Sequence, residues 1–264
     1  NLLTFFIATG KATIEDEISN EYGLLMLLSV LGMMVMISAG SMLSLYLGLE
    51  LQSLCLYILA AIRRDNFKST EAGIKYFILG SFASGMLLYG MSLIYGFAGT
   101  VEFNEIAALH TSHSLNPSFG LILGFVFFLV GLAFKIGAVP FHMWLPDVYE
   151  GSPTPVTAFF SVAPKIAAVS VFLKILLVVF VDLQNYWQQI IMFLSIASMI
   201  FGTFAALNQT NIKRLIAYSA IAHIGFILVG LVAGTEDGIK GVLLYMTIYL
   251  FMIVGIFSVI LAMR

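Results

Sequence analysis

The stretch FKIGAVPFHMWLPDVYEGSPTPVTAFFSVAPK, residues 134–165, decides how this sequence is interpreted. Lys135 lies near its start and Lys165 at its end, each within a hydrophobic run, and prolines, glycines and acidic residues separate them. A lysine inside an apolar segment is energetically costly, and a broken helix at membrane depth is tolerated only where it lines protein or water. The combination is typical of membrane proteins that move ions.

A helix break is expected directly after Lys135. Pro140 has no N–H group, so the carbonyl of Ile136 loses its helical partner, and Gly137 loosens the same turn. Freed carbonyls beside the ammonium would hold water or a proton, which predicts Lys135 as a proton carrier loaded from the inner face. The alternative is a lysine that extends to the membrane surface. The proline-rich connection that follows is interpreted mainly as a structural loop on the inner face.

Lys165 is expected near the bilayer midplane, about ten residues or ~15 Å into its hydrophobic segment. Pro164 should break this helix too, because it frees the carbonyl of Phe160. Lys165 is therefore predicted to be the next proton-carrying station. Lys174 falls on the opposite face of the same helix, and its role is secondary: it either joins the proton path or extends to the outer surface, helped by Asp182.

Glu50 lies about nine residues, or ~13 Å, into the segment SMLSLYLGLELQSLCLYIL, which also places it near the midplane. It is predicted to be a proton-exchanging carboxylate that pairs with a lysine, and the alternative is a protonated, hydrogen-bonded core residue. Lys75 follows Glu71 by one helical turn near the inner end of a span. From that position Lys75 could either take part in the proton path or form a surface ion pair with Glu71, and the sequence favours neither.

The histidines give weaker signals. His223 lies on a small-residue face, where it serves either as a proton relay or as a hydrogen bond between helices. His142 and Trp144 flank the proline-rich connection at the inner interface, and Trp144 is interpreted as an interfacial anchor. His110 and His113 lie in an outer loop, 101–116, which is expected to form a short surface helix; their spacing is weak support for a metal site.

The composition identifies an all-α polytopic membrane protein. Of 264 residues, 61% are hydrophobic and 10% are charged, whereas soluble domains have roughly a quarter charged residues. The net charge of −2 does not suggest a nucleic-acid partner. Cys55 alone cannot form an iron–sulfur or metal site, and the sequence has no nucleotide loop or haem motif, so no cofactor and no metal are expected in this chain. Redox chemistry would then belong to partner chains.

About eight complete spans are predicted, each close to the ~20 residues that cross a bilayer. They cover 22–40, 42–62, 70–97, 118–139, 155–180, 187–208, 212–233 and 239–262, and residues 118–150 are too long for one straight helix. Residues 1–264 are interpreted as a single proton-translocating domain, the central portion of a longer chain, in which 1–8 end a preceding helix and an acidic loop follows.

The basic residues of the loops predict the orientation. One side of the membrane would hold Lys11, Arg63, Arg64, Lys68, Lys213, Arg214 and Arg264, and the other only Lys240. Positive loops face the cytoplasm or matrix, so both ends of this sequence are expected inside.

PFHMWLPDVYEGSPTPVTAFFSVAPK, followed by LNQTNIKRLIAYSAIAHIGFILVG, resembles the antiporter-like membrane subunits of respiratory complex I, NADH:quinone oxidoreductase. The resemblance is almost continuous over 1–264. It implies a larger fold of inverted helix repeats, of which this sequence matches the central part. The second broken helix of that family, with its own lysine, would lie beyond Arg264.

The resemblance also implies roles for single residues. Glu50 matches the intramembrane glutamate of the family, Lys135 the lysine on the first broken helix and Lys165 the bridging lysine. Lys75 matches the lysine next to the glutamate helix, and His223 a central-axis histidine. Glu50 and Lys135 would form a switchable ion pair that controls when the proton on Lys165 moves on.

The implied setting is the bacterial or mitochondrial inner membrane. Quinone, NADH, FMN and iron–sulfur clusters would be bound by partner subunits, and this chain would contact other membrane-arm subunits, lipid, water and protons. Three alternatives remain: a subunit of a multi-chain sodium/proton antiporter, a non-pumping structural spacer with vestigial lysines, and direct quinone binding at 140–155.

Overall fold

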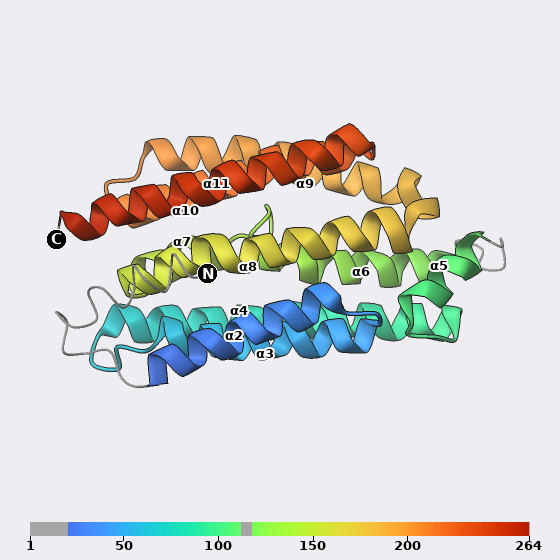
Figure 1. Cartoon of the computed structure of the whole chain (residues 1–264), viewed down its shortest axis with the longest axis horizontal. Helices are drawn as coiled ribbons and strands as arrows, with labels where there is room; N and C mark the ends of the chain where they lie inside the picture. Colours follow the sequence, from blue (N-terminus) through green and yellow to red (C-terminus); the bar gives the residue numbers. More distant parts are fainter. Residues whose placement is uncertain (1–20, 112–117, 264) are drawn as a thin grey trace.

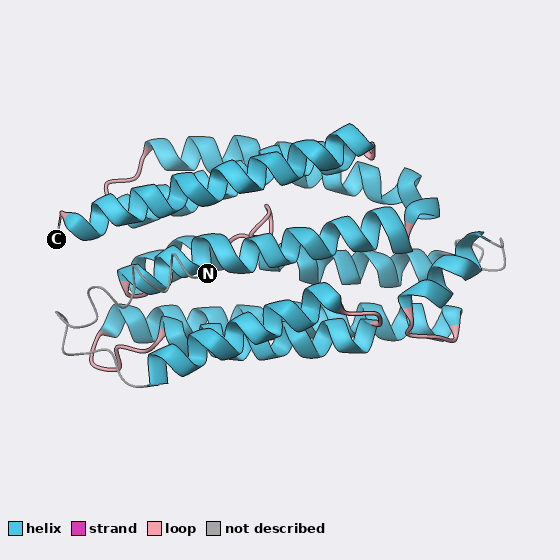
Figure 2. Cartoon of the chain, viewed as in Figure 1, coloured by secondary structure: helices cyan, strands magenta, loops and turns pink. Residues whose placement is uncertain are grey.

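The computed structural model describes residues 21–111 and 118–263, and almost all of this part is helical (Figures 1 and 2). Among the described residues, eight helices are long and apolar enough to cross a membrane. They are α2 (Glu21–Ser38), α3 (Met42–Ala60), α4 (Phe67–Ala98), α6 (Phe119–Ile136), α8 (Thr154–Lys174), α9 (Gln184–Leu207), α10 (Ile212–Ala233) and α11 (Glu236–Ala262). The predicted all-α membrane architecture and its eight spans are confirmed.

Two short helices complete the described part. α5 (Phe103–Thr111) confirms the short helix expected in the 101–116 loop, and α7 (Trp144–Gly151) follows the break after α6. The predictions made for residues 1–20, for His113 and for Arg264 lie outside the described residues, as do those for the side chain of His110.

Capping residues set several helix starts. The hydroxyl of Ser41 accepts the N–H of Ser44 in a capping box, and the side chains of Asn66, Asn211 and Thr235 cap α4, α10 and α11. These side chains bind backbone N–H groups that the first helical turn leaves unpaired. The helix boundaries therefore follow local sequence signals, within a few residues of the predicted spans.

Small residues allow the helices to approach closely. A Cβ atom on Gly32 of α2 would lie 2.5 Å from the backbone N of Gln52, and one on Gly48 of α3 would lie 2.6 Å from the backbone N of Met36. Within a bilayer, helices associate by van der Waals contact, so backbone contact through glycine replaces side-chain interdigitation. α2 and α3 form one close pair in this way.

α8 occupies the centre of the bundle. Figure 1 shows it between the layer of α2, α3 and α4 and the layer of α9, α10 and α11, and most of its side chains are buried. α9 and α11 instead expose many large apolar side chains, as expected of faces that meet lipid or other chains. The position of α8 places Lys165 in the interior.

The expected bend within 118–150 is confirmed, but Gly137 rather than Pro140 ends the helix. α6 stops at Ile136, where Gly137 adopts φ +77°, a left-handed conformation that glycine reaches without strain. Pro140 lies beyond this end. Two of the last carbonyls of α6 are not free: those of Ala133 and Phe134 both accept backbone N–H groups, and that of Phe134 accepts the Trp144 indole as well.

Two further expectations are corrected. α8 continues through Pro164, so this proline does not break the helix; it removes a single backbone hydrogen bond in a helix that is packed on all sides. The proline-rich connection is also more than a loop, because Trp144–Gly151 folds as α7.

Candidate functional site

Glu50 lies half-buried on α3 and is bonded to α4. Its carboxylate accepts a hydrogen bond from the hydroxyl of Ser84, whose oxygen is also 3.2 Å from the Tyr46 hydroxyl. Ser84 was not singled out in the sequence, where it is one of many small residues in α4. The contact gives the intramembrane carboxylate a polar partner across the helix interface.

Lys135 lies in the last turn of α6, with 6% of its surface exposed. Its Nζ donates to the hydroxyl of Ser53 at 2.6 Å and to that of Tyr57 at 3.5 Å, both on α3. The ammonium is also 5.7 Å from the centre of the Tyr57 ring. α3 therefore carries both Glu50 and the two hydroxyl groups that bind Lys135.

Glu50 and Lys135 are close enough to interact electrostatically, but among the described residues they form no direct ion pair. Ser53, about one turn along α3 from Glu50, holds the ammonium instead. The predicted ion pair is thus not observed in this structure, in which each group has a separate partner, and the switchable pair stays a prediction.

Lys165 is 1% exposed on α8, and its Nζ has no hydrogen-bond partner within the described part of the chain. It lies 5.6 Å from the ring centre of Tyr149, on α7. The hydroxyls of Tyr149 and of Tyr249, on α11, are likewise buried without a partner among the described residues. Ordered water normally satisfies such groups. The site suits an amine that exchanges its proton.

His223 bridges α10 and α11. Its Nδ1 is 2.6 Å from the hydroxyl of Tyr245, its ring is 5.2 Å from that of Tyr249, and it interacts electrostatically with Lys165. The hydrogen bond agrees with a role in holding the two helices together. The interaction with Lys165 agrees with a relay, so both interpretations of His223 remain.

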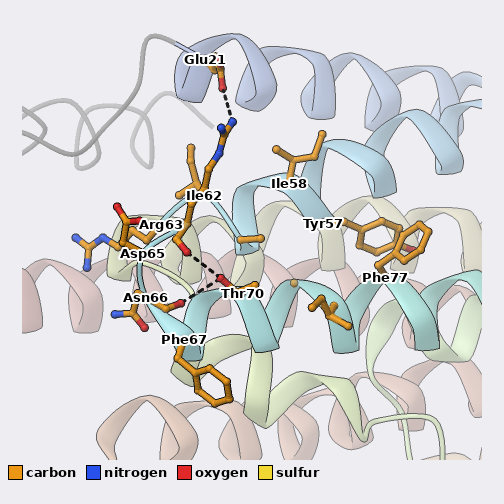
Figure 3. A pocket seen from close by; sticks show the side chains of 14 residues that line it. Glu21, Tyr57, Ile58, Ile62, Arg63, Asp65, Asn66, Phe67, Thr70 and Phe77 are labelled. Atoms are coloured by element: carbon orange, nitrogen blue, oxygen red, sulfur yellow. Dashed lines mark hydrogen bonds and ion pairs between the residues drawn. The ribbon is translucent and has the colours of Figure 1, made fainter.

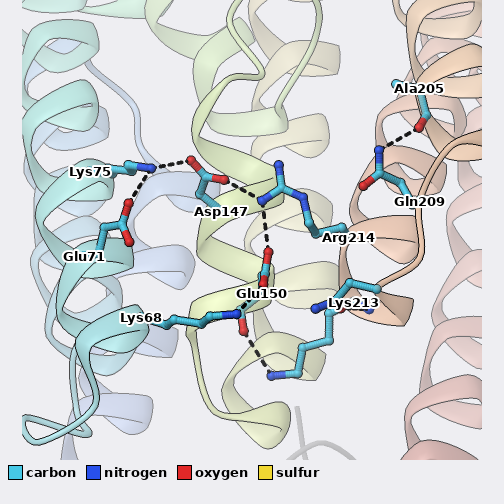
Figure 4. A network of polar contacts seen from close by, with 10 residues as sticks. Lys68, Glu71, Lys75, Asp147, Glu150, Ala205, Gln209, Lys213 and Arg214 are labelled. Atoms are coloured by element: carbon cyan, nitrogen blue, oxygen red, sulfur yellow. Dashed lines mark hydrogen bonds and ion pairs between the residues drawn. The ribbon is translucent and has the colours of Figure 1, made fainter.

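Lys75 belongs to an ion network that the sequence did not reveal (Figure 4). Its Nζ is 2.8 Å from the carboxylate of Glu71 and 2.7 Å from that of Asp147 on α7. Arg214 of α10 binds Asp147 at 2.7 Å and Glu150 at 3.0 Å. The network joins α4, α7 and α10 around a cavity of about 280 Å³. The expected pair with Glu71 is confirmed.

The two acids on α7 are held in their ionised form. Partial burial raises the pKa of Asp147, but the hydrogen bonds and charges of Lys75 and Arg214 outweigh it and keep the pKa below 3.8, its ordinary value. The hydrogen bond from Lys68 lowers the pKa of Glu150 below its ordinary 4.5; burial opposes this shift and Arg214 adds to it. Both carboxylates are therefore charged at neutral pH and serve as fixed anchors.

Lys174 lies apart from the other lysines. Its Nζ donates a hydrogen bond to the carbonyl of Ala39 and lies 5.6 Å from the ring centre of Phe103. The expected support from Asp182 is not observed within the described residues. Lys174 thus joins α8 to the α2–α3 turn and to α5.

The interfacial anchor predicted at Trp144 is wrong. Trp144 is 3% exposed, stacks on Tyr76 with ring centres 4.4 Å apart and donates its indole N–H to the carbonyl of Phe134 at 2.9 Å. The break after α6 directs α7 back into the bundle, which buries the indole. His142 packs edge-on against Phe201 at 4.4 Å.

Within the described residues, no cluster of histidine, cysteine and acidic side chains could hold a metal ion. The expectation that this chain contains no cofactor stays a prediction. The chemistry that the arrangement supports is proton exchange among buried amines, a carboxylate and hydroxyls.

Known proteins resemble this chain over most of its length. The family profile described as NADH:quinone oxidoreductase/Mrp antiporter, transmembrane, matches residues 39–264. NADH-quinone oxidoreductase subunit N of Rhodospirillum rubrum is 57% identical over 263 residues, which are 100% of this chain and 54% of that protein. The same subunit of Beijerinckia indica is 61% identical over 245 residues, 92% of this chain and 50% of that protein.

Solved structures show the same fold. A chain of respiratory complex I from Thermus thermophilus superposes with a TM-score of 0.80 at 32% identity, covering 98% of this chain and 55% of that one. A chain of the Mrp complex from Dietzia gives 0.87 at 26% identity, covering 98% and 48%. The chain thus spans about half the length of the relatives it matches. The resemblance found in the sequence is confirmed: this multi-pass membrane chain belongs to the NADH:quinone oxidoreductase/Mrp antiporter family.

Proposed function

We propose that this chain is part of a proton-translocating membrane subunit of NADH:quinone oxidoreductase. The observation that carries the proposal is the set of ionisable groups inside the bundle: the half-buried Glu50 and the buried Lys135 and Lys165. The chain itself performs no redox chemistry. Quinone, NADH, FMN and iron–sulfur clusters belong to partner subunits, and the neighbours are other membrane-arm subunits and lipid.

The proposed mechanism is electrostatic. When the ammonium of Lys135 leaves Ser53 for the carboxylate of Glu50, its positive charge no longer opposes a proton shift from Lys165 toward His223. When the pair reopens, Lys135 reloads from the inner side. Against a potential of about 180 mV each proton requires ~4 kcal/mol, which quinone reduction in the partners must supply. Lys75 and Lys174 would have secondary roles in this proton path.

The orientation follows from the basic loops. The α3–α4 and α9–α10 connections lie at the same end of the bundle (Figure 1), which we assign to the cytoplasmic or matrix side. In or within one turn of these connections lie Arg63, Arg64, Lys68, Lys213 and Arg214. Both ends of this sequence would then be inside.

The test replaces Lys135 or Lys165 with Met in the full-length subunit, assembled in its complex. Proton pumping per NADH oxidised should fall strongly, while the complex still assembles. Unchanged pumping in both variants would instead support the structural spacer.

A second candidate function is a subunit of a multi-chain sodium/proton antiporter, which the TM-score of 0.87 to the Mrp chain favours. The identity of 57% to subunit N, against 26% to the Mrp chain, favours the oxidoreductase. Copurification with redox subunits separates the two. Direct quinone binding would require a photoreactive quinone to label residues 140–155.

A further inference from the structure

α7 is the shortest α-helix of the described part, and it contacts the surroundings of both buried lysines. A helix of eight residues is too short to be stable by itself, so its position depends on its contacts. Its buried side chains are Trp144, Leu145, Pro146, Val148 and Tyr149. These side chains place one face of α7 in the interior of the bundle.

The first turn of α7 holds the end of α6 that carries Lys135. The indole N–H of Trp144 donates to the carbonyl of Phe134, directly before Lys135, at 2.9 Å. Leu145 packs on the turn that follows, where a Cβ atom added to Gly137 would lie 2.5 Å from the Cδ1 atom of Leu145. A shift of α7 would therefore also shift the helix end from which Lys135 reaches α3.

The second turn of α7 lies against Lys165. The Nζ of Lys165 is 5.6 Å from the ring centre of Tyr149, a distance at which an ammonium is attracted to the face of an aromatic ring. The hydroxyl of Thr157, which is fully buried on α8, lies 3.1 Å from the carbonyl oxygen of Tyr149. α7 thus contacts the surroundings of two lysines that belong to different helices.

Ion pairs hold the two acids of α7 (Figure 4). The Nη1 atom of Arg214, on α10, binds Asp147 at 2.7 Å and Glu150 at 3.0 Å. Lys75 binds Asp147 as well, and Lys68 binds Glu150 at 2.9 Å, both from α4. Arg214 is the cation that binds both acids within the described part of the chain. It therefore joins the two turns of α7 to α10.

We propose that α7 is a strut that fixes the geometry between Lys135 and Lys165, and that Arg214 is the positioning residue that holds this strut in place. The proposal rests on the function proposed above. Proton exchange requires groups held within narrow limits, and a displacement of ~1 Å costs a catalytic site roughly a hundredfold in rate. Arg214 exchanges no proton itself, because a guanidinium stays protonated. It acts through the position of α7.

The first test is Arg214→Gln in the full-length subunit, assembled in its complex. Glutamine removes the charge that binds both acids, so coupled proton pumping should fall about tenfold or more. Arg214→Lys should restore pumping, because both bonds come from one nitrogen atom and an ammonium has three donors. Equal losses in the two variants would overturn the ionic role of Arg214.

Arg64→Gln is the matched control. Arg64 lies in the α3–α4 connection, at the same end of the bundle, and its ion pair with Glu21 at 3.9 Å is the dashed line at Glu21 in Figure 3. The two side chains are 86% and 66% exposed, and the pair does not involve α7. This variant should pump like the parent. A loss equal to that of Arg214→Gln would mean that positive charge at this end matters, and not the position of α7.

The second test asks whether Arg214 acts through α7. Trp144→Phe keeps an aromatic ring and removes the N–H that binds Phe134. If both substitutions displace the same helix, the loss of pumping in the double variant should be smaller than the product of the two single losses. Multiplicative losses would refute the strut. If Arg214→Gln does not assemble, Glu150→Gln, which removes one of the two partners of Arg214, takes its place in this comparison.

Hydrogen–deuterium exchange of the purified complexes reports the state of α7 without reference to pumping. The backbone amides of 144–151 should exchange faster in Arg214→Gln, and those of α2 and α3 should not change, because elements that lose their contacts open locally. Unchanged exchange in α7, or faster exchange in all helices, would overturn the strut.

The outcomes separate this proposal from the proposed function. Normal pumping in Arg214→Gln, together with loss of pumping in Lys135→Met, would refute the positioning role and leave the proposed function intact. Normal pumping in Lys135→Met and Lys165→Met would refute the function, while faster exchange confined to α7 in Arg214→Gln would still support the strut.

Discussion

The carboxylate of Glu50 on α3 and the ammonium of Lys135 on α6 interact electrostatically, and each is held by a different serine. Ser84 binds Glu50, and Ser53 binds Lys135 at 2.6 Å. The two charges interact electrostatically without a direct ion pair among the described residues. Each group can bind either its serine or the other group. The arrangement therefore has two states, which a switch requires.

Ser53→Ala tests this arrangement. Without the serine oxygen, the ammonium loses a hydrogen bond worth about 1.5–3 kcal/mol for a charged donor and should move toward Glu50. The closed pair would then predominate, and the measured ratio of protons pumped to NADH oxidised should fall. Ser81→Ala is the matched control, because Ser81 is an exposed serine on α4 that bonds only its own helix at Phe77. Equal effects of the two substitutions would contradict the switch.

Lys165→Met should separate stability from function. The Nζ of Lys165 is buried without a partner among the described residues, and a charge at the bilayer midplane costs about 2.5–3.5 kcal/mol. Methionine fills a similar volume without a charge, so the variant should be as thermally stable as the parent complex or more stable, yet pump poorly. Marked unfolding of the variant would show that the amine holds the core together.

Asp147→Asn should destabilise the complex. The carboxylate binds Lys75 and Arg214, each at 2.7 Å, and the side chains involved are only 30–43% exposed. Losing its charge should lower the free energy of unfolding by about 1–2 kcal/mol, visible as a lower thermal midpoint. The control Asp237→Asn, whose side chain is 93% exposed beside Lys240, should change stability by less than about 0.5 kcal/mol. A reversed order would mean that the network is not structural.

The same network predicts a dependence on pH. The folded pKa values of Asp147 and Glu150 lie below their ordinary values of 3.8 and 4.5, so both carboxylates stabilise the fold fully at neutral pH. That contribution should be lost as the pH falls below about 4, through the folded pKa values. The difference in thermal midpoint between the parent and Asp147→Asn should therefore shrink on acidification; a constant difference would contradict ionic stabilisation.

Gly48→Ala tests the contact between α2 and α3. A methyl group there would lie 2.6 Å from the backbone N of Met36, and such overpacking costs about 1–3 kcal/mol. At Gly85 of α4, nothing lies within 4 Å of the added Cβ, so Gly85→Ala should be neutral or slightly stabilising. Thermal midpoints of the two purified variants give the comparison, and equal values would refute backbone contact through Gly48.

The sequence by itself determined the class of protein and its eight spans, and it predicted the depth of the ionisable residues. Hydrophobic runs report how long a segment stays in the bilayer, and position along a run reports depth, so Glu50 and Lys165 were found without a structure. The bend after Lys135 could also be predicted from the sequence, because glycine and proline act on the local backbone. The sequence did not show which of these two residues ends the helix. The left-handed turn at Gly137 ends it before Pro140 is reached.

Only the tertiary structure decided which groups meet. Ser53, Ser84 and Tyr57 are ordinary helix residues in the sequence, and they become partners of Lys135 and Glu50 because α4 packs against both α3 and α6. Asp147 forms an ion pair with Arg214, which lies 67 residues away in the sequence. Position along a hydrophobic run indicates the depth of a side chain in the membrane, whereas its partner is set by the rotation and packing of a neighbouring helix, which no single segment encodes.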